Sequence, residues 1–133
     1  MSFDVTLDLA DSAVHAVTLF IQDKVRSKKF YGTTLGLPLI FENDDSAVYR
    51  VGDLLINLLL LEKADELISP ASVAHPDSGS RFQFTISVED VDLMTAAIVS
   101  RGAHLNNGPV DRPWGIRTSS FCDPDGHIWE ICS

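Results

Sequence analysis

The chain contains an internal repeat, and this repeat limits the folds open to it more than any other feature. Val17 to Asp23 and Phe84 to Asp90 each alternate apolar or branched residues with more polar ones, the pattern of a strand with one buried face. Each run ends at an aspartate, a residue favoured at helix N-termini. A helical stretch follows each aspartate, Val25 to Leu35 in the first half and Val91 to Arg101 in the second. The sequence therefore predicts the same order of elements twice.

The two halves also end alike. Each predicted helix stops at a glycine, Gly36 or Gly102, as is common at helix C-termini. Two or three short strands follow each glycine. Gly52 to Leu58 closes the first half and Asp125 to Ile131 closes the second, and both stretches are a turn that leads into a strand. We therefore predict two βαβββ modules in an α+β fold.

The modules share a single domain, residues 1–133, in which a curved mixed sheet surrounds a cleft. Module one spans about residues 14–61 and module two about residues 80–133. Residues 63–80 are rich in Ser, Pro, Asp and Gly and form the connector, with a short helix expected at Ala64 to Ile68. The 133 residues, of which 45% are hydrophobic, suffice for one ordinary core.

Strand alternation separates a core face from a cavity face, because successive side chains point to opposite sides of a sheet. On the core face lie Val17, Leu19 and Ile21 in module one and Phe84, Ile86 and Val88 in module two. On the mixed, more polar face lie Ala16, Thr18, Phe20, Leu55, Asn57 and Leu59, with Gln83, Thr85, Ser87, Ile128, Glu130 and Cys132. A sheet with helices on one side and a mixed second side can curl around a ligand.

Composition excludes several partners. The net charge of −9 argues against nucleic acid and anionic membranes, which attract basic surfaces. The acidity either keeps the protein soluble or favours cationic ligands. The longest apolar run, Leu54 to Leu61, is interrupted by Asn57 and is far shorter than the roughly 18 residues of a membrane span.

The N-terminal stretch and the cysteines favour a cytoplasmic protein. The first residues, Met1 to Val14, carry acids and no basic segment, so no signal peptide is expected. Cys122 and Cys132 have no CxxC spacing, and we expect both to be free thiols.

Several motifs resemble one known superfamily. They are Val17 to Asp23, Phe30-Tyr31 followed by Leu35-Gly36-Leu37, Val88 to Asp92, Pro113 to Arg117, and Asp123-Pro124-Asp125-Gly126 with Glu130. Together they cover nearly the whole chain, and they resemble the vicinal oxygen chelate superfamily. This superfamily holds glyoxalase I, the extradiol dioxygenases, the fosfomycin-resistance enzymes and the bleomycin-resistance proteins. The resemblance implies the two-module fold, but the superfamily spans several chemistries.

The resemblance also implies four cavity-facing metal-ligand positions, which enzymes of the superfamily fill with His or Glu. In this chain they fall on Ala16, Asn57, Gln83 and Glu130. Only Glu130 is an anionic ligand, whereas a catalytic divalent metal usually has about three protein ligands of the His, Glu, Asp or Cys kind. We therefore expect no metal and no cofactor. His15 could replace Ala16 only if a β-bulge reversed its direction, which would also turn the core face outward.

A second group of candidates surrounds Trp114. This residue lies between Pro113 and Gly115 and suits either a rim that stacks on a planar ligand or a packing contact. Arg112 or Arg117 could hold a ligand carboxylate or pair with a neighbouring acid. The Asp123-Pro124-Asp125-Gly126 stretch is interpreted as a turn and not as a calcium loop.

Two functions remain open at this level. The first is a drug-sequestering protein, which would confer antibiotic resistance by binding a small aromatic or cationic molecule without a catalytic metal. The second is an enzyme of the glyoxalase or dioxygenase type that uses Glu130 as metal ligand or general base. Either would use a cleft formed by Ala16, Thr18, Phe20, Asn57, Gln83, Thr85, Trp114, Arg117 and Glu130. We expect a homodimer, with the cleft built within one chain or between two.

Overall fold

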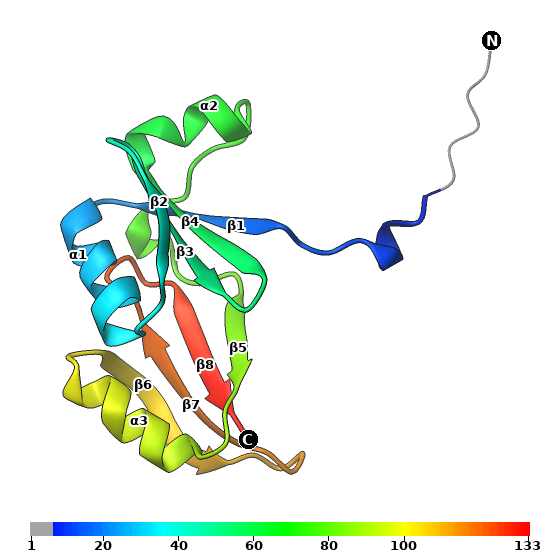
Figure 1. Cartoon of the computed structure of the whole chain (residues 1–133), viewed down its shortest axis with the longest axis vertical. Helices are drawn as coiled ribbons and strands as arrows, with labels where there is room; N and C mark the ends of the chain where they lie inside the picture. Colours follow the sequence, from blue (N-terminus) through cyan, green and yellow to red (C-terminus); the bar gives the residue numbers. More distant parts are fainter. Residues whose placement is uncertain (1–6) are drawn as a thin grey trace.

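The computed structural model describes residues 7–133 and consists of two four-stranded sheets (Figure 1). The first has the order β1-β4-β3-β2 and the second β5-β8-β7-β6. In each of these orders the first strand is parallel to the second, and the remaining pairs of neighbouring strands are antiparallel. The predicted α+β fold is confirmed. The strands form two sheets because all their pairings lie within one half of the chain.

The elements follow the repeat that the sequence predicts. The first half contains β1 (Ala16–Ile21), α1 (Lys24–Lys28), a π-helical segment η2 (Lys29–Thr34), β2 (Leu39–Glu42), β3 (Ser46–Val51) and β4 (Leu54–Leu60). The second half contains β5 (Gln83–Ser87), α3 (Val91–Ser100), β6 (His104–Asp111), β7 (Arg117–Cys122) and β8 (Ile128–Cys132). Four short helical segments lie outside the modules: η1 (Leu9–Asp11), η3 (Leu61–Lys63), α2 (Asp65–Ile68) and η4 (Pro76–Ser78).

Local sequence signals explain where the main helices begin. Asp23 caps α1 by accepting a hydrogen bond from the backbone nitrogen of Arg26 at 3.1 Å, and Asp90 caps α3 through Leu93 at 3.0 Å. Such caps satisfy backbone N–H groups that have no partner within the helix. The predicted first helix differs in one respect, because it changes from α-helix to π-helix at Lys29.

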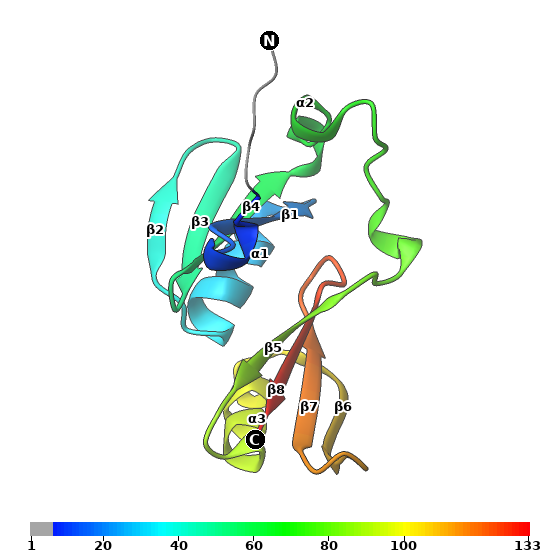
Figure 2. The same ribbon diagram turned by 90° about the vertical axis from the view of Figure 1, so that its right-hand side faces the viewer.

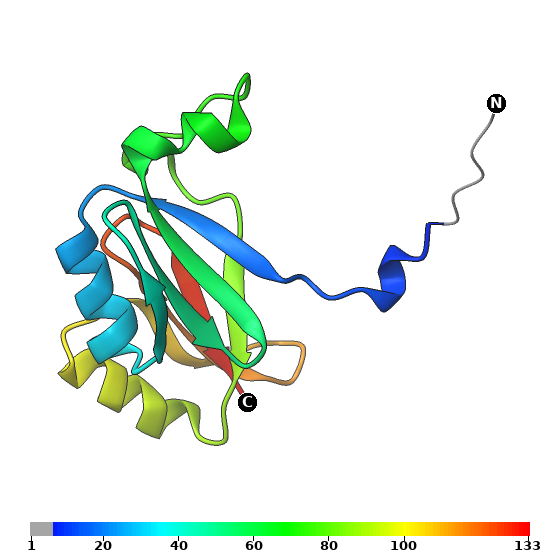
Figure 3. The same ribbon diagram turned by 45° about the horizontal axis from the view of Figure 1, so that its top comes forward.

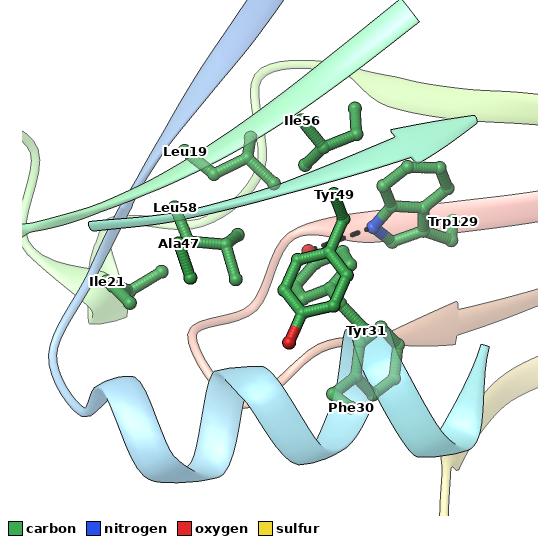
Figure 4. Packing of buried hydrophobic residues seen from close by; sticks show 9 residues of the cluster. All are labelled: Leu19, Ile21, Phe30, Tyr31, Ala47, Tyr49, Ile56, Leu58 and Trp129. Atoms are coloured by element: carbon green, nitrogen blue, oxygen red, sulfur yellow. Dashed lines mark hydrogen bonds between the residues drawn. The ribbon is translucent and has the colours of Figure 1, made fainter. Parts of the chain in front are cut away.

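The core lies between the sheets and the helices. Its larger cluster joins Leu19, Ile56 and Leu58 from the first sheet to Phe30 and Tyr31 from η2. Figure 4 shows that Trp129, from β8 in the other half, projects into this same cluster. A smaller cluster packs α3 on the second sheet through Val91, Ile98, Phe121 and Ile131. The first cluster therefore belongs to both halves of the chain.

The alternation of buried side chains follows the predicted core face. In β1, Leu19 and Ile21 are buried, whereas Thr18 and Phe20 are only half-buried. In β8, Trp129 and Ile131 are buried, and Glu130 between them is half-buried. The strand parity that the sequence predicts is confirmed.

The remaining segments lie at the periphery. The connector runs from α2 past the turn between β7 and β8 to the start of β5 (Figure 2), and residues 7–15 extend away from the sheets (Figure 3). None of the helices in the described part of the chain is long and apolar enough to cross a membrane. Residues 1–6 of the acidic N-terminal stretch, for which no signal peptide is expected, lie outside the described residues.

Candidate functional site

The predicted cavity face of the first sheet is held by a cross-strand hydrogen bond. Thr18 pairs with Asn57 in the parallel register of β1 and β4, and the amide nitrogen of Asn57 donates to Thr18 Oγ1 at 3.3 Å. Phe20 lies further along β1 and is half-buried, whereas Ala16 at its start is exposed. The register of β1 with β4 runs without a shift from Ala16 to Ile21, so no bulge re-aims the exposed His15.

The second sheet repeats this arrangement. Thr85 pairs with Glu130 in the parallel register of β5 and β8, and the hydroxyl of Thr85 donates to Glu130 Oε1 at 3.1 Å. Gln83 begins β5 and is exposed. Thr18–Asn57 and Thr85–Glu130 are therefore equivalent pairs on the two sheets, as the repeat predicts.

The donor set at the four superfamily positions does not fit a divalent metal. Ala16 offers no donor atom, and the amides of Asn57 and Gln83 offer only neutral oxygens. Glu130 is the single carboxylate, and one of its oxygens already accepts from Thr85. Within residues 7–133, no three His, Cys, Asp or Glu side chains come together as a potential metal site.

The candidates around Trp114 lie at the far end of the second sheet. Trp114 occupies the turn between β6 and β7 and is 69% exposed. Arg117 donates two hydrogen bonds to the carboxylate of Asp92, at 2.8 and 2.9 Å, and a third to Asp111 at 3.0 Å. These ion pairs raise the pKa of Arg117 further and lower that of Asp92. Arg117 thus contacts acids of its own module and is not hydrogen-bonded to Glu130.

A buried polar network lies where the two halves meet, and no motif in the sequence predicts it. Asp123 is 4% exposed and accepts hydrogen bonds from the Tyr31 hydroxyl at 2.6 Å and from His127 Nδ1 at 2.8 Å. The backbone nitrogens of Asp125 and His127 also donate to it. The indole nitrogen of Trp129 donates to the Tyr31 hydroxyl at 3.1 Å (Figure 4).

A second buried carboxylate lies beside the first. Asp125 is 7% exposed and accepts from the backbone nitrogen of Gln22 at 3.0 Å and from the hydroxyl of Ser27 at 3.3 Å. The Asp-Pro-Asp-Gly stretch is a turn, as predicted, with Gly126 at φ 93°. Its two acids also bind the first module, which turn chemistry alone does not indicate.

Burial and charge shift the ionisation of this network. Burial, together with the charge of Asp123, raises the pKa of Tyr31 well above its ordinary value, so the hydroxyl stays protonated. Burial also raises the pKa of Asp125, and the charge of Asp123 adds to this. Burial alone would lower the pKa of His127, but its hydrogen bond to Asp123 and the two nearby carboxylates raise it overall. His127 is therefore oriented by Asp123 and readily protonated.

A cavity of about 160 Å³ adjoins His127. Its walls come from the end of β1, the start of η3, the connector, the two residues just before β5 and the turn before β8. They are formed by Phe20, Leu61, Ala74, His75, Pro76, Gly79, Ser80, Arg81, Phe82, Asp125, Gly126 and His127. A second hollow of about 280 Å³ includes Asn57 and Leu59 on the face of the first sheet. Of the predicted cleft residues, Phe20 thus borders the first cavity and Asn57 the second.

Comparisons with known proteins agree with this architecture. The family model of the Glyoxalase/Bleomycin resistance protein/Dioxygenase superfamily matches residues 13–131. The uncharacterized protein YraH of Bacillus subtilis is 32% identical over 119 residues, which cover 86% of this chain and 93% of that protein.

Solved structures give the same result. A glyoxalase-related enzyme from Fulvimarina pelagi superposes with a TM-score of 0.80 at 26% identity, over 91% of this chain and 87% of its own. A glyoxalase/bleomycin resistance protein/dioxygenase from Nocardioides has the same fold, with a TM-score of 0.83 at 23% identity over 96% and 85% of the two chains. The chain belongs to the Glyoxalase/Bleomycin resistance protein/Dioxygenase superfamily.

Proposed function

We propose that this protein binds a small aromatic or cationic molecule on its cavity face and does so without a catalytic metal. The observation that carries the proposal is the donor set at the four superfamily positions, where Ala16, Asn57 and Gln83 accompany a single carboxylate, Glu130. Glu130 then acts as a hydrogen-bond acceptor or counter-ion for the ligand. The half-buried ring of Phe20, on the cavity face of the first sheet, supplies an apolar surface for the ligand. Sequestration of a drug in this way would confer antibiotic resistance.

The proposal includes a homodimer in the cytoplasm. The cavity-face pairs Thr18–Asn57 and Thr85–Glu130 lie on separate sheets, and a second copy would bring the face of one module against the face of the other. Such a two-fold arrangement creates two equivalent clefts. The cytoplasmic location rests on Cys122 and Cys132, which are both free thiols. Light scattering after size-exclusion chromatography tests the dimer, and a monomeric mass would contradict it.

The binding proposal is tested by titrating the protein with aromatic cationic drugs such as bleomycin and analysing the drug by mass spectrometry. We expect binding with recovery of the intact drug. Glu130→Gln should weaken binding by about tenfold, since the charge-assisted contact is lost. Glu89→Gln removes the same charge at an exposed position just after β5 and should have little effect.

Two results would overturn this proposal. Recovery of a chemically modified drug, with turnover lost in Glu130→Gln, would favour an enzyme that uses Glu130 as general base. Tag-free protein that retains close to one equivalent of Zn, Ni, Mn or Fe would indicate a dedicated metal site, whereas less than about a tenth of an equivalent agrees with the proposal.

A further inference from the structure

We propose that the cavity of about 160 Å³ beside His127 is a binding site for a small aromatic carboxylate. Its size suits a single ring, because a protein cavity of about 150 Å³ is large enough to hold benzene. This site is distinct from the sheet faces invoked for the proposed function, apart from Phe20, which borders both.

The walls of the cavity favour a planar apolar ring. Phe20 and Phe82 line it together with Leu61, Ala74 and Pro76. Phe82 is 54% exposed. Its ring meets that of Phe84 edge to face, with the ring centroids 5.3 Å apart. Phe84 in turn stacks on the buried Trp129, with the ring centroids 4.2 Å apart. A bound ring would cover Phe82 and extend this aromatic series outward from the core.

Two of the side chains that line the cavity carry N–H donors suited to a carboxylate. Arg81 lines the cavity, and within the described part of the chain its guanidinium has neither a hydrogen bond nor an ion pair. Guanidinium groups bind carboxylates through two parallel hydrogen bonds. His127 also lines the cavity, and because its Nδ1 is bonded to Asp123 at 2.8 Å, Nε2 is the nitrogen left for a ligand.

The acids near the cavity already accept hydrogen bonds from other groups of the protein. For this reason we expect the ligand of the cavity to be an anion and not a cation. Asp125 lines the cavity, but its two oxygens accept from Gln22 and Ser27. Asp123 is buried behind His127 and accepts from Tyr31 and His127. A third acid, Asp77, has a carboxylate oxygen 3.5 Å from Nδ1 of His75, which lies at the cavity wall. Among the charged side chains that line the cavity in the described part of the chain, Arg81 is thus the one without a hydrogen bond or ion pair.

Titration of the full chain with benzoate, followed by two-dimensional amide NMR, tests the site. We expect saturable shifts of the Gly79 and Gly126 amides, both at the cavity wall, with a dissociation constant on the order of 1 mM for so small a ligand. Benzylamine has the same ring with a positive charge and should bind at least about tenfold more weakly. Equal or tighter binding of benzylamine, or benzoate shifts confined to the Thr85–Glu130 face, would overturn the proposal.

A charge-removing variant links the binding to Arg81. Because Arg81 is exposed and has neither a hydrogen bond nor an ion pair within residues 7–133, Arg81→Gln should fold normally and bind benzoate about tenfold more weakly. Arg50→Gln is the matched control, since it removes the same charge from the exposed side of β3. An Arg81→Gln affinity equal to that of Arg50→Gln would refute the site. Benzoate and the cationic drug are titrated separately, so failure of one proposal is distinguishable from failure of the other.

Discussion

At the scale of single residues, Asp123 shows how a turn residue becomes part of a core. Its carboxylate accepts one hydrogen bond from the Tyr31 hydroxyl, in the first half of the chain, and another from His127, in the second. A buried carboxylate is stable only where donors surround it, and four donors meet that requirement here. The contact with Tyr31 spans 92 positions, so no local pattern in the sequence indicates it.

The raised pKa of His127 predicts a pH dependence of stability. A group whose pKa is higher in the folded state than in the unfolded state stabilises the fold fully below its unfolded value, about 6.5 for histidine. This contribution is lost as the pH rises through the folded-state pKa. The free energy of unfolding should therefore fall from about pH 6.5 upward, partly through His127.

The His127→Asn variant isolates that contribution. Asparagine keeps a donor for Asp123 but does not titrate, so the fall in unfolding free energy above about pH 6.5 should be reduced. Urea denaturation at a series of pH values measures it. Asp125 has the same sign of effect because its pKa is also raised, but it acts from about pH 4 upward. His104→Asn, at an exposed position on β6, serves as the control. Identical pH profiles for both variants would refute the assignment.

At the scale of elements, the parts of the fold that depend on local chemistry are predictable from sequence. The helix caps at Asp23 and Asp90 and the left-handed glycines at Gly36 and Gly102 lie where the sequence places them. The alternation of buried and less buried side chains along the strands is also predicted correctly, because it depends only on residues that are neighbours in the sequence. The sequence does not predict the π-helical segment Lys29–Thr34, because six residues are too few to distinguish the period of a π-helix from that of an α-helix.

The hairpin of β6 and β7 gives a prediction at this scale. Gly108 has φ +94°, and a Cβ there would lie 2.4 Å from the carbonyl oxygen of Thr118 on β7. Gly115, in the turn of the same hairpin, has φ +96° but no atom within 4 Å of such a Cβ. Both Gly→Ala changes incur the left-handed strain of about 1 kcal/mol.

Only Gly108→Ala adds a steric clash with the neighbouring strand. Overpacking of this kind costs about 1–3 kcal/mol, so this variant should be less stable than Gly115→Ala by that margin. Thermal and urea denaturation of the two variants measure the difference. Equal stabilities would mean that β6 and β7 separate readily at this point, contrary to the close packing seen here.

At the scale of the whole molecule, the sequence predicts which residues share a face but not which faces meet. The equivalent pairs Thr18–Asn57 and Thr85–Glu130 follow from the repeat. The cavity beside His127 depends on how the connector passes the turn before β8 (Figure 2). That path depends on packing between segments that are far apart in the sequence. The connector is rich in Ser, Pro and Gly, and its sequence has no periodic pattern from which the path could be predicted.

The shared core predicts that both modules unfold together. Trp129 belongs to β8, yet it is 3% exposed and packs among Leu19, Tyr49 and Ile56 of the first module. Loss of either module would expose a large apolar surface of the other, which couples their stabilities.

In a Trp114→Phe variant, which changes only the exposed tryptophan, fluorescence reports Trp129 alone. The urea midpoint from this fluorescence should coincide with that from far-ultraviolet circular dichroism. A fluorescence change that precedes the loss of secondary structure would show that the modules separate before they unfold, and the interface would then contribute little to stability.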